Sequence, residues 1–286
     1  MYEYEGKYIT LMLCSDCNNK CKHCYVKYNG NFTEEILNEL VPALSEKYSL
    51  ILNGTEPILH PEFYPFFKFS EGGTILTNGL ELIRKPELSK ILKEHGIQNI
   101  HLSYHFGIHD EISLVKTEEL NNLIKRLKEE GFTIKLMTSI CKDNCNDIIS
   151  FCKQAHELGV DKIKFTNFIF QGNASSNYQH NILLNQDEID SVLKQIEEAR
   201  SLFDEDELYI QRCGSFGPSK DKAKFECFAV HNNVVVTPDG NVYMCVFDVD
   251  KGNEIGKLID GKIMIYDEYK HISDGYCKVF RKYNKL

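Results

Sequence analysis

A chain of 286 residues, of which 42% are hydrophobic and 26% charged, is long and apolar enough to bury a core in one large domain or two smaller ones. That balance excludes an intrinsically disordered protein. The formal net charge of −9 and the pI of about 5.6 disfavour a general affinity for nucleic acid phosphates. Eleven cysteines without a secretory signal or a long apolar segment indicate a reducing compartment, for which the cytoplasm is the simple interpretation, and no membrane partner is expected.

Strand-like and helix-like segments alternate through the first 205 residues, which is typical of parallel βα units. The expected strands are residues 8–13, 50–52, 74–76, 100–103, 133–139 and 162–168. The expected helices are residues 33–48, 61–69, 86–95, 117–130, 146–158 and 186–203. Six such repeats predict an α/β protein built on a partial (β/α)6 TIM-like barrel.

Directly behind the first expected strand, Cys17, Cys21 and Cys24 form a C-x3-C-x2-C run. A cubic iron-sulfur cluster is usually held by four cysteine thiolates, so a run of three can leave one iron open for a small molecule. The spacing also allows a zinc site completed from elsewhere in the chain, or three ordinary reduced thiols.

Other distinctive residues follow the next strands in order. Gly54, Thr55 and Glu56 come after the second expected strand, Asn78 comes after the third, and Ser103 closes the fourth. Because the chemistry of βα barrels lies at the carboxyl ends of the strands, we expect these residues to face one cavity together with the cysteine run. Taken singly, Gly54 and Asn78 are also ordinary turn residues.

The cysteine run, with the aromatic Tyr25 after its third cysteine, resembles the signature of the radical S-adenosylmethionine superfamily. Residues 53–57, Asn-Gly-Thr-Glu-Pro, resemble its Gly-Gly-Glu-Pro motif, with a threonine in place of the second glycine. Residues 75–79 and 100–103 resemble the ends of its third and fourth strands. The resemblance implies that the three cysteines hold a 4Fe-4S cluster and that S-adenosylmethionine chelates the open iron. Reductive cleavage would then give a 5′-deoxyadenosyl radical that abstracts hydrogen from a substrate.

The resemblance also gives individual roles. Glu56 and the backbone at Gly54 and Thr55 would hold the methionine ammonium, Ser103 would contact the ribose, and Tyr25 would approach the adenine. A β-branched residue at position 55 restricts the backbone where glycine is usual. The residues expected to bind the cofactor are Tyr25, Gly54, Thr55, Glu56, Asn78, Ser103, Thr138 and Ser139.

A second cysteine pattern occupies residues 206–286, which are expected to form an extension after a core of residues 1–205. Cys227 and Cys245 flank residues 233–243, whose valine run and Pro-Asp-Gly turn predict a β-hairpin. This resembles the opening half of a SPASM or twitch extension, in which such cysteines bind an auxiliary 4Fe-4S cluster, with Cys277 as third ligand and Cys213 as fourth. No further dense cysteine group follows Cys245, so one auxiliary cluster is expected. Alternatively, Cys213 is a buried thiol, or a catalytic thiol that gives a hydrogen atom to a substrate radical.

The remaining cysteines and histidines carry weaker signals. Cys141, Cys145 and Cys152 are interpreted as ordinary thiols, because no family motif covers them. His105 and His109 could enter the barrel mouth as proton-transfer groups, although solvated loop histidines are commoner.

The function expected from these features is that of a radical S-adenosylmethionine oxidoreductase that modifies a ribosomally synthesised peptide by cross-linking, thioether formation, epimerisation or dehydrogenation. A flavodoxin or ferredoxin would be the reductant. Since the first expected strand begins near residue 8, the peptide would be bound by the barrel or delivered by a partner. One alternative is a small-molecule dehydrogenase acting on a sugar or alcohol. An alternative of another class is a zinc- or iron-sulfur-binding protein without catalysis.

Overall fold

The computed structural model describes residues 1–26, 29–60, 72–216, 232–269 and 277. Its strands are β1 (Tyr2–Glu3), β2 (Tyr8–Met12), β3 (Ser49–Asn53), β4 (Gly73–Thr77), β5 (Ile97–Ser103), β6 (Thr133–Ile140), β7 (Lys162–Asn167), β8 (Tyr209–Arg212), β9 (Asn233–Val236), β10 (Asn241–Tyr243), β11 (Gly256–Ile259) and β12 (Lys262–Ile265). Its α-helices are α1 (Glu34–Ser45), α3 (Leu80–Arg84), α4 (Leu88–Glu94), α5 (His109–Ile112), α6 (Thr117–Glu129), α7 (Ile148–Glu157), α8 (Asn173–Asn177) and α9 (Gln186–Arg200).

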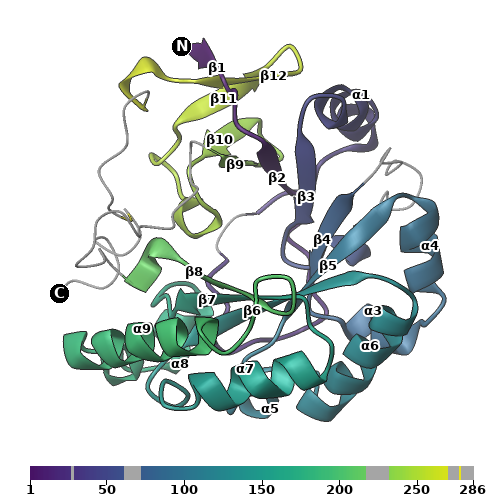
Figure 1. Cartoon of the computed structure of the whole chain (residues 1–286). Helices are drawn as coiled ribbons and strands as arrows, with labels where there is room; N and C mark the ends of the chain where they lie inside the picture. The colour runs from purple at the N-terminus through teal and green to yellow at the C-terminus, as the bar shows by residue number, and fades with distance from the viewer. Residues whose placement is uncertain (27–28, 61–71, 217–231, 270–276, 278–286) are drawn as a thin grey trace.

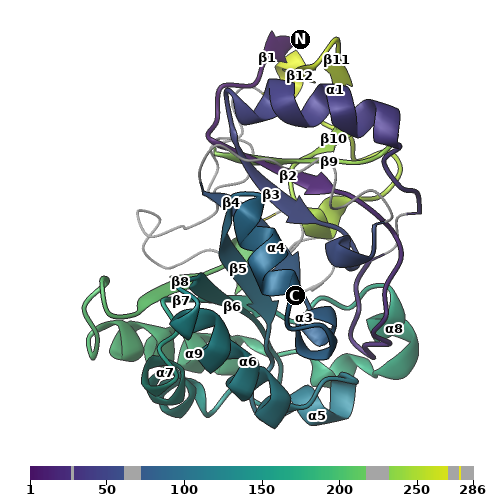
Figure 2. The ribbon, with the colours of Figure 1, turned by 90° about the vertical axis from the view of Figure 1, so that its right-hand side faces the viewer.

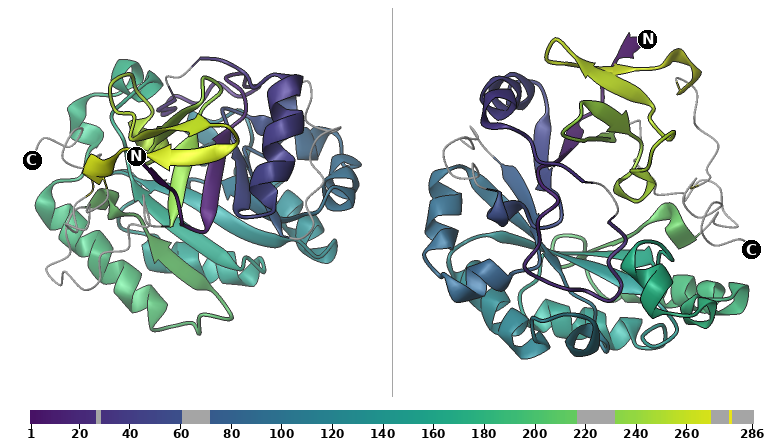
Figure 3. Two further views of the ribbon diagram at one scale, coloured as in Figure 1. Left: turned by 90° about the horizontal axis from the view of Figure 1, so that it is seen from above. Right: turned by 180° about the vertical axis from the view of Figure 1, so that it is seen from behind.

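All twelve strands belong to one sheet with the order β1-β12-β11-β10-β9-β2-β3-β4-β5-β6-β7-β8. The run from β9 through β2 to β8 is parallel throughout. The sheet curls and stays open between β8 and the β1 end, while α4, α6, α7 and α9 lie along its outside (Figures 1, 2 and 3). This arrangement confirms the predicted partial barrel.

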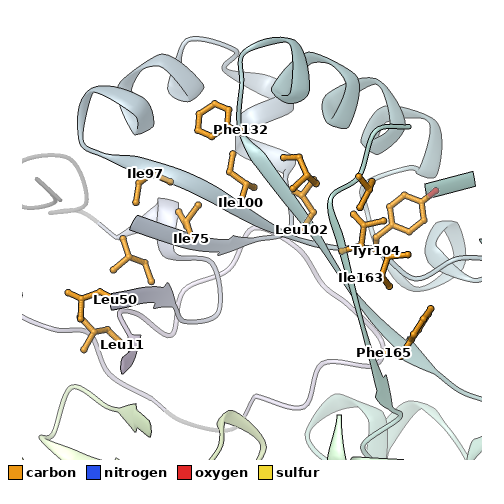
Figure 4. Packing of buried hydrophobic residues seen from close by; sticks show 14 of the residues in the cluster. Leu11, Leu50, Ile75, Ile97, Ile100, Leu102, Tyr104, Phe132, Ile163 and Phe165 are labelled. Carbon is orange, nitrogen blue, oxygen red and sulfur yellow. The ribbon is translucent and has the colours of Figure 1, made fainter. Parts of the chain in front are cut away.

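The core lies between the curled sheet and the outer helices. On β5 and β7, Ile100, Leu102, Ile163 and Phe165 are completely buried and point toward the helices (Figure 4). Because successive side chains of a strand face opposite sides, the residues between them lie on the inner face of the sheet. Truncating one of these core residues to alanine should cost about 2–5 kcal/mol of stability.

Local sequence explains where the main helices begin and end. The Thr33 hydroxyl accepts a hydrogen bond from the Ile36 N–H at the start of α1, which confirms the expected start. Asn185 caps α9, accepting from the Glu188 N–H at 2.9 Å while the Glu188 carboxylate accepts from the Asn185 N–H at 2.7 Å. Gly131 ends α6 with a φ of +81°, a conformation that glycine adopts without a steric penalty.

The predicted hairpin is also present, and it continues the barrel sheet. β9 and β10 pair antiparallel, with Val242 opposite Val236, and β9 pairs in parallel with β2, with Val234 opposite Ile9. β8 follows residue 205 yet adds to the other edge of the sheet, beside β7. Both ends of the parallel run, β9 and β8, are thus built from residues assigned to the extension. The division at residue 205 stays a prediction.

The sequence missed the shortest elements. β1, β8, α3, α5 and α8 have between two and five residues, too few for a helical or strand period to be recognised. The helix expected at 61–69 lies outside the described residues. In the described part of the chain, no helix combines the length and apolarity needed to cross a membrane.

Candidate active site at the strand ends

The cysteine run lies in the loop between β2 and α1. The Cys17 side chain is exposed, whereas Cys21 and Cys24 are partly buried. The Cys24 N–H donates to the Cys21 carbonyl at 3.3 Å, and the Asn19 N–H donates to the Cys17 sulfur at 3.3 Å. Three thiols are therefore presented on one short, internally hydrogen-bonded loop.

The segment after β7 fixes this loop, as Figure 2 shows where the purple chain after β2 reaches α8. The Asn173 N–H donates to the Cys24 carbonyl at 2.8 Å, and its side-chain amide donates to the Cys21 carbonyl at 3.2 Å. Gly172, at φ +60°, lies so close that an added Cβ would be 2.5 Å from the Cys24 carbonyl oxygen. No sequence motif marked either residue. The only signal was a Gly-Asn pair after the sixth expected strand.

The three thiols suit an iron-sulfur cluster. Burial raises the pKa of Cys21 to about 12, with Cys24 and Cys17 adding to the rise, so a bound cation is needed to hold the thiolates. Soft sulfur donors select iron-sulfur clusters or zinc. Among the described residues, no group of three or more His, Cys, Asp or Glu side chains could hold a single metal ion. A cubic cluster places each thiolate on a different iron, and three thiols on one loop fit such a cluster.

Glu56 is the central carboxylate of the site and is only 1% exposed. The Thr77 hydroxyl donates to one of its oxygens at 2.7 Å, and the Asn78 N–H donates to the other at 2.8 Å. Burial raises the pKa of Glu56 to about 7, against the lowering effect of these hydrogen bonds. A nearby cation such as an ammonium would favour the charged form.

Hydrogen bonds join this carboxylate to the cysteine loop. The Glu56 N–H donates to the Asp16 carbonyl at 3.0 Å. The Asn78 amide donates to the Asn18 side chain at 3.0 Å and lies 3.9 Å from the Cys17 sulfur. The structure therefore brings together three separate sequence motifs, at the ends of β2, β3 and β4.

The backbone around residue 54 has the expected turn. Gly54 has a φ of +148° and donates its N–H to the Asn53 side chain at 2.8 Å. The Thr55 N–H donates to the Cys14 carbonyl at 2.9 Å. The Thr55 hydroxyl oxygen is buried and has no hydrogen-bond partner among the described residues, so the residue that departs from the family pattern adds an available polar atom.

The three candidates on β5 and β6 differ in their availability. Ser103 lies on the inner face of the sheet, in register with Met137. The Ser139 hydroxyl is 3.4 Å from the Thr166 hydroxyl. The Thr138 hydroxyl instead donates to the Tyr104 carbonyl at 2.7 Å and is buried, so Ser139 is the better placed of the two neighbours.

His23, inside the cysteine run, lies in a cluster with His105 and His109. The ring centroids of His23 and His105 are 4.4 Å apart, and the His105 N–H donates to His109 Nδ1 at 3.1 Å. His105 and His109 are buried, so the expectation that loop histidines are solvated was wrong for them. Burial lowers the pKa of His23 and of His109 to about 4, and that of His105 well below its usual value. All three rings are neutral near pH 7.

The second cysteine group is only partly described. Cys245 and Cys277 pack in one apolar cluster with Ile169, Tyr25 and Phe247, and the Tyr25 and Phe247 ring centroids are 4.5 Å apart. Cys277 is buried, and Cys245 is partly buried. This cluster connects the end of the first cysteine run with the extension.

The other two proposed ligands of the auxiliary cluster are Cys213 and Cys227. Cys213 follows β8, where its N–H donates to the Phe165 carbonyl at 2.7 Å. Cys227 lies outside the described residues. Cys141, Cys145 and Cys152 are buried, as expected for ordinary thiols.

Comparison with curated proteins finds two distant relatives, while no family model matches the chain. The Fe-coproporphyrin III synthase of Methanosarcina barkeri is 25% identical over 195 residues, which are 59% of this chain and 46% of that protein. The pre-heme d1 synthase of Dinoroseobacter shibae is 25% identical over 177 residues, which are 56% of this chain and 43% of that protein. The matches thus span less than half the length of either relative.

Solved structures share the fold more extensively. Streptococcus suis SuiB bound to S-adenosylmethionine superposes with a TM-score of 0.67 at 16% identity, over 87% of this chain and 62% of that one. The protein anSMEcpe with bound AdoMet gives a TM-score of 0.63 at 18% identity, over 88% of this chain and 77% of that one. The chain shares the fold of these S-adenosylmethionine-bound proteins, and its open barrel carries the three-cysteine loop and the Glu56 turn at its strand ends.

Proposed function

We propose that Cys17, Cys21 and Cys24 hold a 4Fe-4S cluster beside which S-adenosylmethionine binds, and that this site modifies a ribosomally synthesised peptide. The observation that carries the cofactor assignment is the buried Glu56 carboxylate, joined through Asn78 to the cysteine loop. When bound, the cluster and S-adenosylmethionine supply a 5′-deoxyadenosyl radical. The activity is that of an oxidoreductase, with a flavodoxin or ferredoxin as the reductant and the cytoplasm as its location.

The protein's own groups orient the cofactor. Glu56 accepts hydrogen bonds from the methionine ammonium, and this pairing offsets the cost of burying the carboxylate. Gly54 and Thr55 offer backbone groups to the methionine end of S-adenosylmethionine. Ser103 and Ser139 offer hydroxyls to the ribose or the methionine carboxylate. Tyr25 would contact the adenine.

The extension, residues 206–286 in this proposal, binds one auxiliary 4Fe-4S cluster. Cys245 and Cys277, which pack in one apolar cluster, are two ligands, and Cys227 and Cys213 complete the set. The alternative for Cys213 is a hydrogen-atom donor to a substrate radical. Replacing Cys213 with alanine separates these roles: loss of auxiliary iron marks a ligand, whereas intact iron with a stalled substrate radical marks a donor.

The peptide assignment is supported by solved structures of the same fold in which SuiB is bound to the precursor peptide SuiA and anSMEcpe to the Cp18Cys peptide. A second candidate is a small-molecule substrate, whether a sugar or alcohol oxidised by a dehydrogenase or a compound of another kind. The names of the two curated synthases favour it. The third alternative is a cluster- or zinc-binding protein without catalysis.

Anaerobic reconstitution separates these classes. The wild-type protein should bind iron and sulfide and, once reduced, convert S-adenosylmethionine into 5′-deoxyadenosine. Cys24→Ala should lose the site's iron and the cleavage, whereas Cys145→Ala, which removes a buried thiol away from the loop, should keep both. An intact reduced cluster that cleaves no S-adenosylmethionine would identify a non-catalytic protein. Turnover of a precursor peptide or of a small molecule would then identify the substrate.

A further inference from the structure

The inner face of strands β5 to β8 carries a group of basic side chains. His101, Lys135 and Lys162 are register partners on three neighbouring strands. Lys164 lies two residues beyond Lys162 and therefore on the same face, in register with Gln211. The intervening residues on these strands belong to the buried core under the helices, which assigns the lysines to the opposite, inner side.

Among the described residues, no acidic side chain pairs with these lysines. The four strands contain no Asp or Glu, and Lys135, Lys162 and Lys164 form no ion pair within the described part of the chain. The amine of Lys135 donates to the Gln211 side chain at 2.8 Å. In a chain with a net charge of −9, like charges gathered on a partly buried face raise the free energy of the empty site.

The side chains interact electrostatically. Burial and, to a smaller extent, the charges of Lys164 and Lys162 together lower the pKa of Lys135 to about 7. Burial also lowers the pKa of His101 well below its usual value, with the same lysines adding to the effect. A bound anion would relieve this repulsion and favour the charged form of Lys135.

We infer that Lys135, Lys162 and Lys164 form a subsite that binds a carboxylate of the substrate. The inference rests on the proposed function, because it assumes that the substrate binds at the inner face of the barrel. Register supports that position. Ser103, Met137 and Lys164 are register partners across β5, β6 and β7. The next inward-facing register pair, Ser139 and Thr166, lies two residues farther along, about 6–7 Å toward the strand ends. A substrate held by its carboxylate would thus extend from the lysines toward the cofactor residues.

The test is anaerobic calorimetry on the reconstituted holoenzyme with two probes. The first is metal-free coproporphyrin III, a small tetracarboxylate with no iron for thiols to ligate. The second is pentaglutamate, compared with pentaglutamine as its uncharged match. Lys162 is exposed, so Lys162→Gln should fold normally. The double variant Lys135→Gln/Lys164→Gln removes the two more buried lysines of the group. Lys194→Gln, on the exposed side of α9, is the matched control.

Wild type and Lys194→Gln should bind one carboxylated probe equally well, and binding should weaken with added salt. The double variant should bind it about tenfold or more weakly, and Lys162→Gln should show a smaller loss. Preference for the porphyrin indicates a small carboxylated substrate, and preference for pentaglutamate indicates an acidic peptide. Absence of binding by wild type, or equal binding by all variants, would overturn the subsite. Formation of 5′-deoxyadenosine without substrate, measured on the same samples, tests the proposed function separately.

Discussion

The two halves of the barrel mouth differ in how fully their polar groups are paired. At the ends of β2, β3 and β4, the Glu56 carboxylate, Thr77, Asn78 and Asn18 are linked in one network that reaches Cys17. In the half formed by β5 to β8, both amide atoms of Asn167 are buried without a hydrogen-bond partner among the described residues.

The lysines of the same half repel one another, as described above. The hydrogen bonds around Glu56 hold its side-chain partners in one geometry before a ligand binds. Unpaired polar groups, in contrast, remain available to a ligand. The comparison indicates a hydrogen-bonded network around Glu56 in one half, and a buried unpaired amide and a group of like charges in the other.

The largest effect should come from the centre of the paired half. In Glu56→Gln, the amide oxygen can still accept from Asn78, but the negative charge opposite the ammonium is lost. S-adenosylmethionine should bind the reconstituted protein roughly 100-fold more weakly or worse, because unpairing a buried charge typically costs about 3–5 kcal/mol. Equilibrium dialysis measures this loss. Iron content should not change, and Glu94→Gln, an exposed substitution on α4, should bind as wild type does.

The same substitution predicts a pH-dependent stability difference. Burial raises the folded-state pKa of Glu56 from 4.5 to about 7, so stability from the protonated carboxyl is fully present below pH 4.5 and is lost as pH rises to 7. Glu56→Gln has no such loss. Relative to wild type, the free energy of unfolding of the cluster-free variant should increase by roughly 3 kcal/mol between pH 4 and pH 8. A constant difference in urea titrations at several pH values would show that Glu56 is already ionised near neutrality.

A smaller effect should come from the contact that holds the cysteine loop. Gly172→Ala places a Cβ 2.5 Å from the Cys24 carbonyl oxygen at a φ of +60°. Its cost should be about 1–3 kcal/mol, and reconstituted iron should fall because the loop must move. Gly159→Ala is the control: φ is +77°, but the nearest atom is the Lys128 side chain at 3.8 Å, so only backbone strain is added. Equal iron content in both variants would mean that the loop does not depend on Gly172.

Sequence predicted the paired half better than the other one. The strands through β7 were located to within a few residues because apolar residues alternate or run together between turn signals, and Glu56 and Asn78 were found because motifs mark strand ends. Nothing local showed that His105 and His109 are buried, since a short loop has no period. Lys135 and Lys164 lie 29 residues apart in sequence. Only strand register places them on one face, and their strands were expected without a register.

Asn167 and Asn144 allow the comparison to be tested at its smallest expected effect. Both side chains are 1% exposed, but the Asn144 amide donates to the Phe106 and Ser139 carbonyls and accepts from the Cys141 N–H at 2.9 Å. Asn144→Leu should therefore destabilise the protein by about 1–3 kcal/mol. Asn167→Leu removes unpaired polar atoms from a buried position and should raise the free energy of unfolding by about 1 kcal/mol.

Urea titration of the two variants measures these opposite signs. A loss for Asn167→Leu as large as that for Asn144→Leu would mean that the Asn167 amide is satisfied in the folded protein. The β5 to β8 half would then be as fully paired as the cofactor half. The opposite signs would instead show that the Asn167 amide is a buried polar group whose desolvation no hydrogen bond offsets in the folded protein.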